Sequence, residues 1–149
     1  MLCSDIMKID IECVSPETSI RDAARKMRDQ NVGFLPACDE SMRVVGTITD
    51  RDITVRAVAA NRPPEKPVEE ILTHGIIACR PEDDLSCARE LMSQHQISRI
   101  MCINRSGRIE GVISLSDIVD WDDIGGASVL REVSARERRG DSGRQSAGL

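Results

Sequence analysis

An internal repeat constrains this chain more than any other feature of its sequence. Pro16 corresponds to Pro81 and Gly46 to Gly111, each pair 65 positions apart, and no gap is needed between the pairs. The same spacing relates Ile6 to Ile71, Ile11 to Ile76, Glu17 to Glu82, Ala23 to Ala88, Met27 to Met92, Ile48 to Ile113, Asp52 to Asp117 and Ile53 to Ile118. A repeat of this kind is a duplicated supersecondary unit. Because one unit is too small to close a core alone, we expect the two copies to bury a shared aliphatic layer.

Both copies show the same order of expected elements: strand, helix, strand, strand, helix. Helical spacing is clear at Ile20, Ala23 and Met27, and Thr18 or Ser19 is the expected N-cap. The expected strands of the first copy span 9–14, 34–38 and 44–48, with a final helix over 52–60. In the second copy a helix follows Asp83 and Asp84, the hairpin strands span 99–103 and 109–113, and the final helix spans 117–121. This pattern predicts an α+β fold.

The repeat also sets the expected domain boundaries. The first domain spans residues 2–60 and the second spans residues 68–121. The proline-rich segment 61–67 between them is typical of a semi-rigid linker. Residues 122–149 are rich in Arg, Ser, Gly and Glu, which predicts a disordered C-terminal tail with at most a marginal helix over 124–133.

Composition narrows the classes of partner. Aromatic residues make up 1% of the 149 residues, Phe34 and Trp121 alone, and the net charge is −5. Nucleic-acid binding relies on aromatic stacking or on positive charge, so we expect no nucleic-acid partner. A local arginine or a helix N-terminus can still hold a small phosphate. The chain shows no basic leader and no apolar run of membrane-spanning length, so we expect a cytoplasmic protein without membrane association.

The six cysteines stand at positions 3, 13, 38, 79, 87 and 102. None lies in a C-x-x-C pair and the two histidines are distant from them in sequence, so we expect no metal site. Cys13, Cys38, Cys79 and Cys102 fall in apolar runs, where a reduced cysteine behaves as a small hydrophobic residue. Redox sensing remains an open alternative.

A hydroxyl residue precedes an aspartate by three positions at the same place in both copies, Thr49 before Asp52 and Ser114 before Asp117. An aspartate in the first turn of a helix can accept hydrogen bonds from both vicinal hydroxyls of a ribose. The neighbouring hydroxyl and backbone N–H groups suit a phosphate. The same spacing also fits a capping box, which stabilises a helix by about 0.5–2 kcal/mol and binds nothing. Spacing alone favours the capping interpretation.

Two pairs of segments resemble the CBS domain family. They are VGFLP at 32–36 with its copy ISRIM at 97–101, and GTITDRDI at 46–53 with its copy GVISLSDI at 111–118. The resemblance covers about residues 2–121 and departs from the family at Met101, where a proline is usual. It implies a CBS-domain pair of two tandem β-α-β-β-α repeats, packed sheet to sheet with pseudo-two-fold symmetry. It also implies adenosine-phosphate contacts at the motif aspartates.

The resemblance implies two unequal nucleotide sites. The stronger site is expected to comprise Asp10, Glu12, Val32, Gly33, Phe34, Arg99, Val112, Ser114, Ser116 and Asp117. The weaker site is expected to comprise Thr47, Thr49, Arg51, Asp52, Gly75, Ile77, Ile97 and Ser98. Arg99 occupies a position from which family members direct a guanidinium at phosphate, and its counterpart is Phe34. The alternative for Arg99 is a surface ion pair, and the carboxylate of Glu12 would either repel phosphate or accept an adenine amine.

These features predict a regulatory module that senses an adenine nucleotide (AMP, ADP or ATP) and has no catalytic activity or required cofactor. No His/Cys or Ser/His/Asp constellation accompanies either motif. The resemblance implies a homodimer through CBS–CBS packing, and an unidentified regulated protein is a further expected partner. Two alternatives stay open: a ligand-independent dimerisation or interaction scaffold, and a binder of another adenosyl ligand such as S-adenosylmethionine or NAD.

Overall fold

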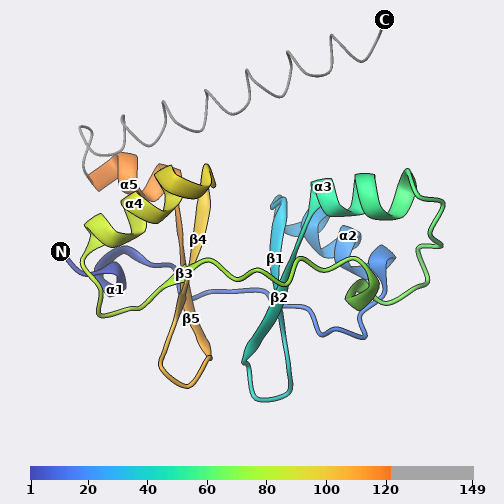
Figure 1. The fold of residues 1–149 in the computed structure, drawn as a ribbon, viewed down its shortest axis with the longest axis horizontal. Coiled ribbons are helices and arrows are strands. Elements are labelled where there is room, and N and C mark those ends of the chain that lie inside the picture. Colours follow the sequence, from blue (N-terminus) through green and yellow to red (C-terminus); the bar gives the residue numbers. More distant parts are fainter. Residues whose placement is uncertain (122–149) are drawn as a thin grey trace, which may run out of the picture. The chain divides into compact units, whose positions relative to one another are not determined.

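The computed structural model describes residues 1–121, so the expected tail over 122–149 and its helix over 124–133 lie outside the described residues. The chain forms two compact units whose membership does not follow the repeat (Figure 1). The Asp52 unit comprises residues 10–76 and 105–109. The Asp117 unit comprises residues 1–9, 77–104 and, within the described part, 110–121. The N-terminal residues 1–9 therefore pack with the second copy.

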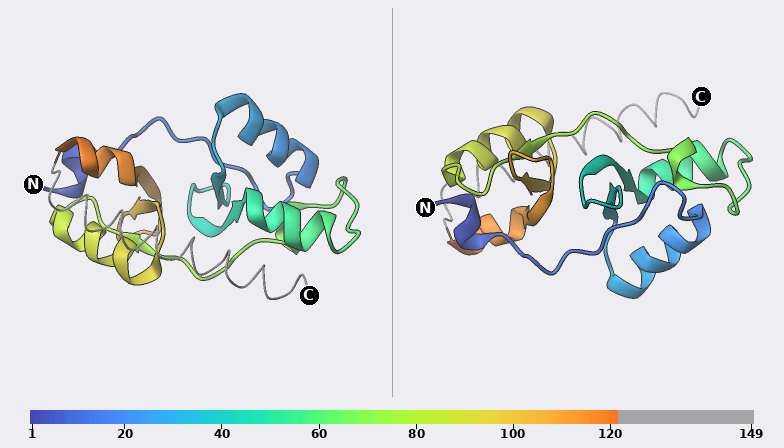
Figure 2. Two further views of the ribbon diagram at one scale, coloured as in Figure 1. Left: turned by 90° about the horizontal axis from the view of Figure 1, so that it is seen from above. Right: turned by 90° about the horizontal axis from the view of Figure 1, so that it is seen from below.

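The Asp52 unit is built on a two-stranded antiparallel sheet in which β1 (Phe34–Cys38) pairs with β2 (Val44–Thr49). α2 (Ile20–Gln30) lies beside the helical segment formed by α3 (Asp50–Asp52) and η1 (Ile53–Val58), as both views of Figure 2 show. A short 3-10 turn, η2 (Val68–Glu70), follows later in the chain. The core consists of the buried residues Val14, Ile20, Ala23, Met27, Leu35, Ala37, Ile48, Ala57, Val68, Ile71 and Leu72.

The Asp117 unit has a three-stranded sheet of order β3-β4-β5, formed by β3 (Ala78–Cys79), β4 (Arg99–Ile103) and β5 (Ile109–Ser114). β3 runs parallel to β4, and α4 (Leu85–His95) packs against both. α1 (Cys3–Ile6) and α5 (Leu115–Trp121) complete the unit. Its core consists of Cys3, Ile6, Cys79, Leu85, Ala88, Met92, Ile100, Cys102, Ile113 and Ile118. Both cores are built from aliphatic and sulfur-containing side chains, as the scarcity of aromatic residues requires.

The two copies exchange the segments that precede their first strands. Lys8 pairs with Val112 of the second copy, and at the 65-residue spacing Thr73 pairs with Thr47 of the first copy. The same spacing relates the bridge between Leu2 and Asp84 to the bridge between Pro67 and Ser19. β2 and β5, the strands that lead into Asp52 and Asp117, therefore each pair with a segment from the other copy of the repeat. We call these two segments, around Thr73 and Lys8, the exchanged segments.

Two expected elements of the first copy differ from the observed ones, and in the second copy the helix expected over 117–121 begins at Leu115. The strand over 9–14 does not form, and Val14 makes only one parallel bridge with Ala37, the counterpart of the pairing between β3 and β4. The helix expected over 52–60 begins at Asp50 and becomes π-helical in η1. The hydroxyl of Thr54 donates to the carbonyl of Asp50, and the carbonyl of Thr54 accepts from the N–H of Ala59. The bond between Ala59 and Thr54 is π-helical, since it spans five residues.

Candidate functional site

Both Thr/Ser–Asp motifs form capping boxes at a strand-to-helix junction. The N–H of Asp52 donates to Oγ1 of Thr49 at 3.1 Å, and the N–H of Thr49 donates to Oδ2 of Asp52 at 2.9 Å. The corresponding distances for Ser114 and Asp117 are 3.2 Å and 2.9 Å. Capping therefore does occur in both copies. It occupies one oxygen of each carboxylate and leaves the second oxygen for other partners.

A glycine before each motif brings the exchanged segment close to the carboxylate. A Cβ added at Gly46 would lie 2.9 Å from the carbonyl oxygen of Thr73. A Cβ added at Gly111 would lie 2.6 Å from Sδ of Met7. Both distances are shorter than real Cβ contacts, so the absence of a side chain permits the approach. The glycine in the motif is thus explained by packing in both copies.

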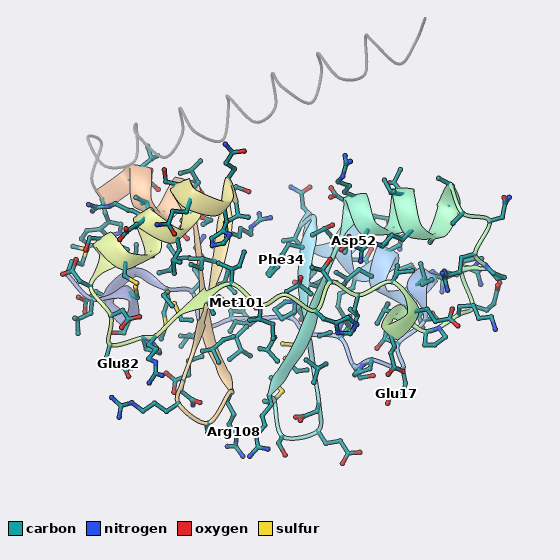
Figure 3. The ribbon with its side chains drawn as sticks, viewed as in Figure 1. Glu17, Phe34, Asp52, Glu82, Met101 and Arg108 are labelled. Carbon is teal, nitrogen blue, oxygen red and sulfur yellow. The ribbon has the colours of Figure 1, made fainter. Side chains whose placement is uncertain are left out.

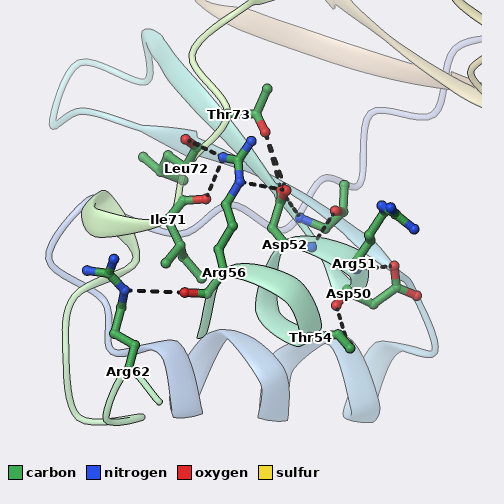
Figure 4. A network of polar contacts seen from close by, with 10 residues as sticks. Asp50, Arg51, Asp52, Thr54, Arg56, Arg62, Ile71, Leu72 and Thr73 are labelled. Atoms are coloured by element: carbon green, nitrogen blue, oxygen red, sulfur yellow. Dashed lines mark hydrogen bonds and ion pairs between the residues drawn. The ribbon is translucent and has the colours of Figure 1, made fainter. Parts of the chain in front are cut away.

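In the Asp52 unit the carboxylate of Asp52 lies beside a cation held by several partners (Figure 4). Nε of Arg56 is 3.8 Å from Oδ1 of Asp52, and the hydroxyl of Thr73 is 3.5 Å from both carboxylate oxygens. The guanidinium of Arg56 also donates to the carbonyls of Ile71 at 3.2 Å and Leu72 at 3.1 Å. Arg56 therefore links the carboxylate of Asp52 to the backbone carbonyls just before Thr73 in the exchanged segment.

In the Asp117 unit the second carboxylate oxygen faces a lysine. Nζ of Lys8 lies 3.4 Å from Oδ1 of Asp117, whose side chain is 13% exposed. The backbone of Lys8 exchanges two hydrogen bonds with Val112, at 2.9 Å and 3.0 Å. Oγ of Ser114 is 2.8 Å from Oγ of Ser116. The site thus combines one carboxylate, one ammonium and two hydroxyls.

The cations beside the two motif aspartates come from positions that do not correspond in the repeat. Lys8 corresponds to Thr73 at the 65-residue spacing, and Arg56 corresponds to Trp121. The cation near Asp117 therefore comes from the exchanged N-terminal segment, whereas the cation near Asp52 comes from the helix that follows the motif. The two carboxylates are equivalent in position and differ in chemical surroundings.

Several residues expected at the stronger site belong to the Asp52 unit. Asp10 and Glu12 are exposed, and Val32, Gly33 and Phe34 are partly buried. Figure 3 labels Phe34, at the start of β1, and Asp52, at the end of α3. The carbonyl of Gly33 accepts from the N–H of Asp50, which joins the start of β1 to the start of α3.

Glu12 is already paired within the Asp52 unit. Its carboxylate lies 3.3 Å from Nζ of Lys26. Hydrogen bonds from Gln30 and Lys26 hold the pKa of Glu12 below its ordinary value. Glu12 is therefore an ionised carboxylate with a local counter-ion.

Of the weaker-site residues in the same unit, Thr47 is buried and exchanges backbone hydrogen bonds with Thr73, at 2.9 Å in each direction. Thr49 and Asp52 form the capping box described above, and Arg51 and Gly75 are exposed. The structure thus brings the motif residues together and leaves the side chain of Arg51 at the surface.

The remaining weaker-site residues belong to the Asp117 unit. Ile77 and Ile97 are partly buried and pack against its core, and the carbonyl of Ser98 accepts from the N–H of Leu115. Arg99 is also partly buried, and within residues 1–121 its guanidinium has no hydrogen bond or ion pair. The structure therefore does not support a surface ion pair for Arg99.

The grouping of residues from both units into two sites stays a prediction. Sequence reasoning did not find Lys8, Arg56 and Thr73. Arg56 was detectable as a basic residue one helical turn after Asp52. Lys8 and Thr73 carry no such local signal, because only the exchange of segments brings them to the motifs.

Residues 1–121 show neither a cluster of metal ligands nor a membrane-spanning helix. Within this range no group of three or more His, Cys, Asp or Glu side chains is arranged to hold a metal ion. No described helix is both long enough and apolar enough to cross a bilayer. All six cysteines are free thiols.

Comparison with known proteins places the chain among tandem repeat proteins of one family. The family model described as CBS domain matches residues 3–58 and 68–123. The CBS domain-containing protein YhcV of Bacillus subtilis is 33% identical over 114 residues, which cover 76% of this chain and 80% of that protein. Hypoxic response protein 1 of Mycobacterium tuberculosis is 30% identical over 115 residues, which cover 76% of this chain and 80% of that protein.

Two solved structures share the fold. Hypoxic Response Protein I, solved with two coordinated zinc ions, has a TM-score of 0.74 and 28% identity, covering 81% of this chain and 98% of that chain. A CBS domain pair solved in complex with 5′-methylthioadenosine and S-adenosyl-L-methionine has a TM-score of 0.72 and 29% identity, covering 81% of this chain and 94% of that chain.

Proposed function

The chain belongs to the CBS domain family, with two such domains in tandem, and from this premise we propose that it is a regulatory module that binds an adenosine-containing small molecule. Binding would change the shape or the association of the protein, to the extent that the ligand prefers one state over another. The proposal includes no catalytic step, because the polar groups at both motifs are explained by ligand orientation.

The observation that carries this proposal is the carboxylate oxygen at each motif that the capping box does not use. Asp117 uses Oδ2 for the N–H of Ser114, while Oδ1 faces the exposed ammonium of Lys8. A carboxylate held in this way can accept hydrogen bonds from the two vicinal hydroxyls of a ribose. The relative solved with 5′-methylthioadenosine and S-adenosyl-L-methionine supports this class of ligand.

Within this class we propose an adenine nucleotide, AMP, ADP or ATP, as the regulatory ligand. Arg99 supports the proposal, because the residue is partly buried and its guanidinium is unpaired among the described residues. A planar guanidinium suits a phosphate through paired hydrogen bonds. S-adenosylmethionine and NAD remain the adenosyl alternatives that a binding experiment separates.

Calorimetry with AMP, ADP, ATP, GMP, NAD, S-adenosylmethionine and 5′-methylthioadenosine tests the proposal. We expect Asp117→Asn to weaken the tighter binding event about tenfold or more, because a hydrogen bond to a charged group contributes about 1.5–3 kcal/mol. Asp52→Asn is the matched variant and should leave most of the tighter event intact. The amide oxygen of asparagine can still accept the N–H of Thr49 or Ser114, so the capping geometry is retained.

A wild-type protein that binds no adenosine-containing compound would overturn the proposed function. Equal losses in Asp117→Asn and Asp52→Asn would contradict the inequality of the two sites.

Exposed apolar residues on η1 favour a second candidate, an interaction scaffold that pairs with itself without ligand. Val58 is 71% exposed and Val55 is 49% exposed, three positions apart on the same helical segment. Light scattering of the wild type and of Val58→Glu tests this candidate. The scaffold would be favoured if the wild type forms a dimer that Val58→Glu dissociates and if the wild type binds none of the nucleotides.

A further inference from the structure

The ion pair between Lys8 and Asp117 differs from the other contacts of the motif because it is easily broken. The side chain of Lys8 is 74% exposed, and within residues 1–121 its ammonium has no other hydrogen bond or ion pair. Because the ammonium is largely in solvent, water screens its attraction to the carboxylate and can replace it as a partner. The backbone of Lys8 is nevertheless fixed by its hydrogen bonds to Val112. Lys8 therefore presents a mobile ammonium from a fixed position.

The cation at Asp52 has no such freedom. Arg56 is held by Asp52 and by the carbonyls of Ile71 and Leu72. Moving its guanidinium would leave two backbone carbonyls without these donors, and each lost hydrogen bond has a cost. Arg56 is therefore a structural cation, whereas Lys8 is available to a ligand.

The hydroxyls beside Asp117 add a donor of their own. Oγ of Ser114 accepts the N–H of Asp117 and shares one hydrogen bond with Oγ of Ser116. Two hydroxyls carry two hydrogens, and only one of them is used within the pair. The other can donate to a ligand oxygen. The surroundings of Asp117 thus offer an ammonium and a hydroxyl donor to an anionic group.

We propose that Lys8 determines the ligand class of the Asp117 site by moving from Asp117 to an anionic group on the ligand when the ribose hydroxyls take the carboxylate. Without Lys8, the charge of Asp117 would repel a phosphate held close to it. With Lys8, the site selects adenosyl ligands that carry an anionic 5′ group over those that do not. This inference rests on the proposed function and specifies its ligand class.

AMP and 5′-methylthioadenosine are the probes, because they share base and ribose and differ in the 5′ group. Both are titrated by calorimetry in an Asp52→Asn background, so that the Asp117 site dominates the signal. We expect Lys8→Gln to weaken AMP binding about tenfold, the loss of one charge-assisted contact. Binding of 5′-methylthioadenosine should be unchanged or tighter, because Lys8 no longer competes for Asp117.

Two further variants separate a local contact from net charge. Lys66→Gln removes the same charge from an exposed side chain of the Asp52 unit and should leave the AMP to 5′-methylthioadenosine ratio unchanged. Lys8→Arg should retain the preference for AMP. Melting temperatures of all variants confirm that each is folded.

The outcomes distinguish this inference from the function on which it rests. A protein that binds none of the adenosine-containing compounds overturns the proposed function, whereas a protein that binds another of them but neither probe overturns this inference alone. A protein that binds AMP, with the same ratio of affinities in Lys8→Gln as in the parent, overturns the role of Lys8 and leaves the function standing. An equal loss in Lys66→Gln also overturns it, because the effect would then be one of overall charge.

Discussion

At the residue scale, Gly46 has a steric role that Gly75 lacks. A Cβ at Gly46 meets the backbone carbonyl of Thr73 at 2.9 Å, whereas a Cβ at Gly75 meets nothing within 4 Å. We expect Gly46→Ala to lower the free energy of unfolding by about 1–3 kcal/mol, because a backbone segment has to move. Gly75→Ala is the matched control, since both substitutions restrict the unfolded chain equally. Urea denaturation followed by circular dichroism measures the difference, and similar values for both variants would contradict the packing role of Gly46.

At the element scale, α2 shows how one side chain sets the start of a helix. The sequence left Thr18 and Ser19 as equal candidates for the N-cap. In the structure Oγ of Ser19 accepts the N–H of Asp22 at 3.0 Å, while Oγ1 of Thr18 accepts the N–H of Ser15. We expect Ser19→Ala to lower the free energy of unfolding by about 1 kcal/mol and Ser19→Asn to recover most of it, because asparagine caps as well as serine. Thermal and urea denaturation test this, and a loss that Ser19→Asn does not recover would show that capping is not the cause.

At the scale of the whole molecule, the reactivity of the Cys3 thiol indicates whether residues 1–9 are packed against the second copy of the repeat. Cys3 is 0% exposed because residues 1–9 pack into the core of the Asp117 unit beside Cys79 and Cys102. Cys38, Cys79 and Cys102 are buried as well, and a thiol that the reagent cannot reach does not react. We therefore expect brief alkylation of the native protein at pH 7.5 to spare Cys3, Cys38, Cys79 and Cys102, while all six cysteines react in denaturant. Peptide mass spectrometry identifies the sites, with the partly buried Cys87 as an internal comparison. Labelling of Cys3 as fast as in denaturant would show that residues 1–9 are not docked.

Much of the fold was predictable because its signals are local. The strands over 34–38 and 99–103 are observed with the expected bounds, and β2 and β5 extend only one residue further than expected. The strand expected over 9–14 was wrong, because a strand needs a partner along its length and Val14 finds one only at Ala37. The helix expected over 52–60 is observed over 50–58, and its π-helical part is a detail that the sequence did not predict.

The candidate site also has one part that local sequence signals predict and one part that they do not. The sequence by itself determined the duplication, the positions of Asp52 and Asp117 and the hydroxyl residues that hold them, because hydrogen bonds three residues apart follow from backbone geometry. Only the tertiary structure decided which cation faces each carboxylate. Lys8 reaches Asp117 from 109 positions away in the chain, because the copies exchange their leading segments, and spacing along a sequence contains no information on such an exchange.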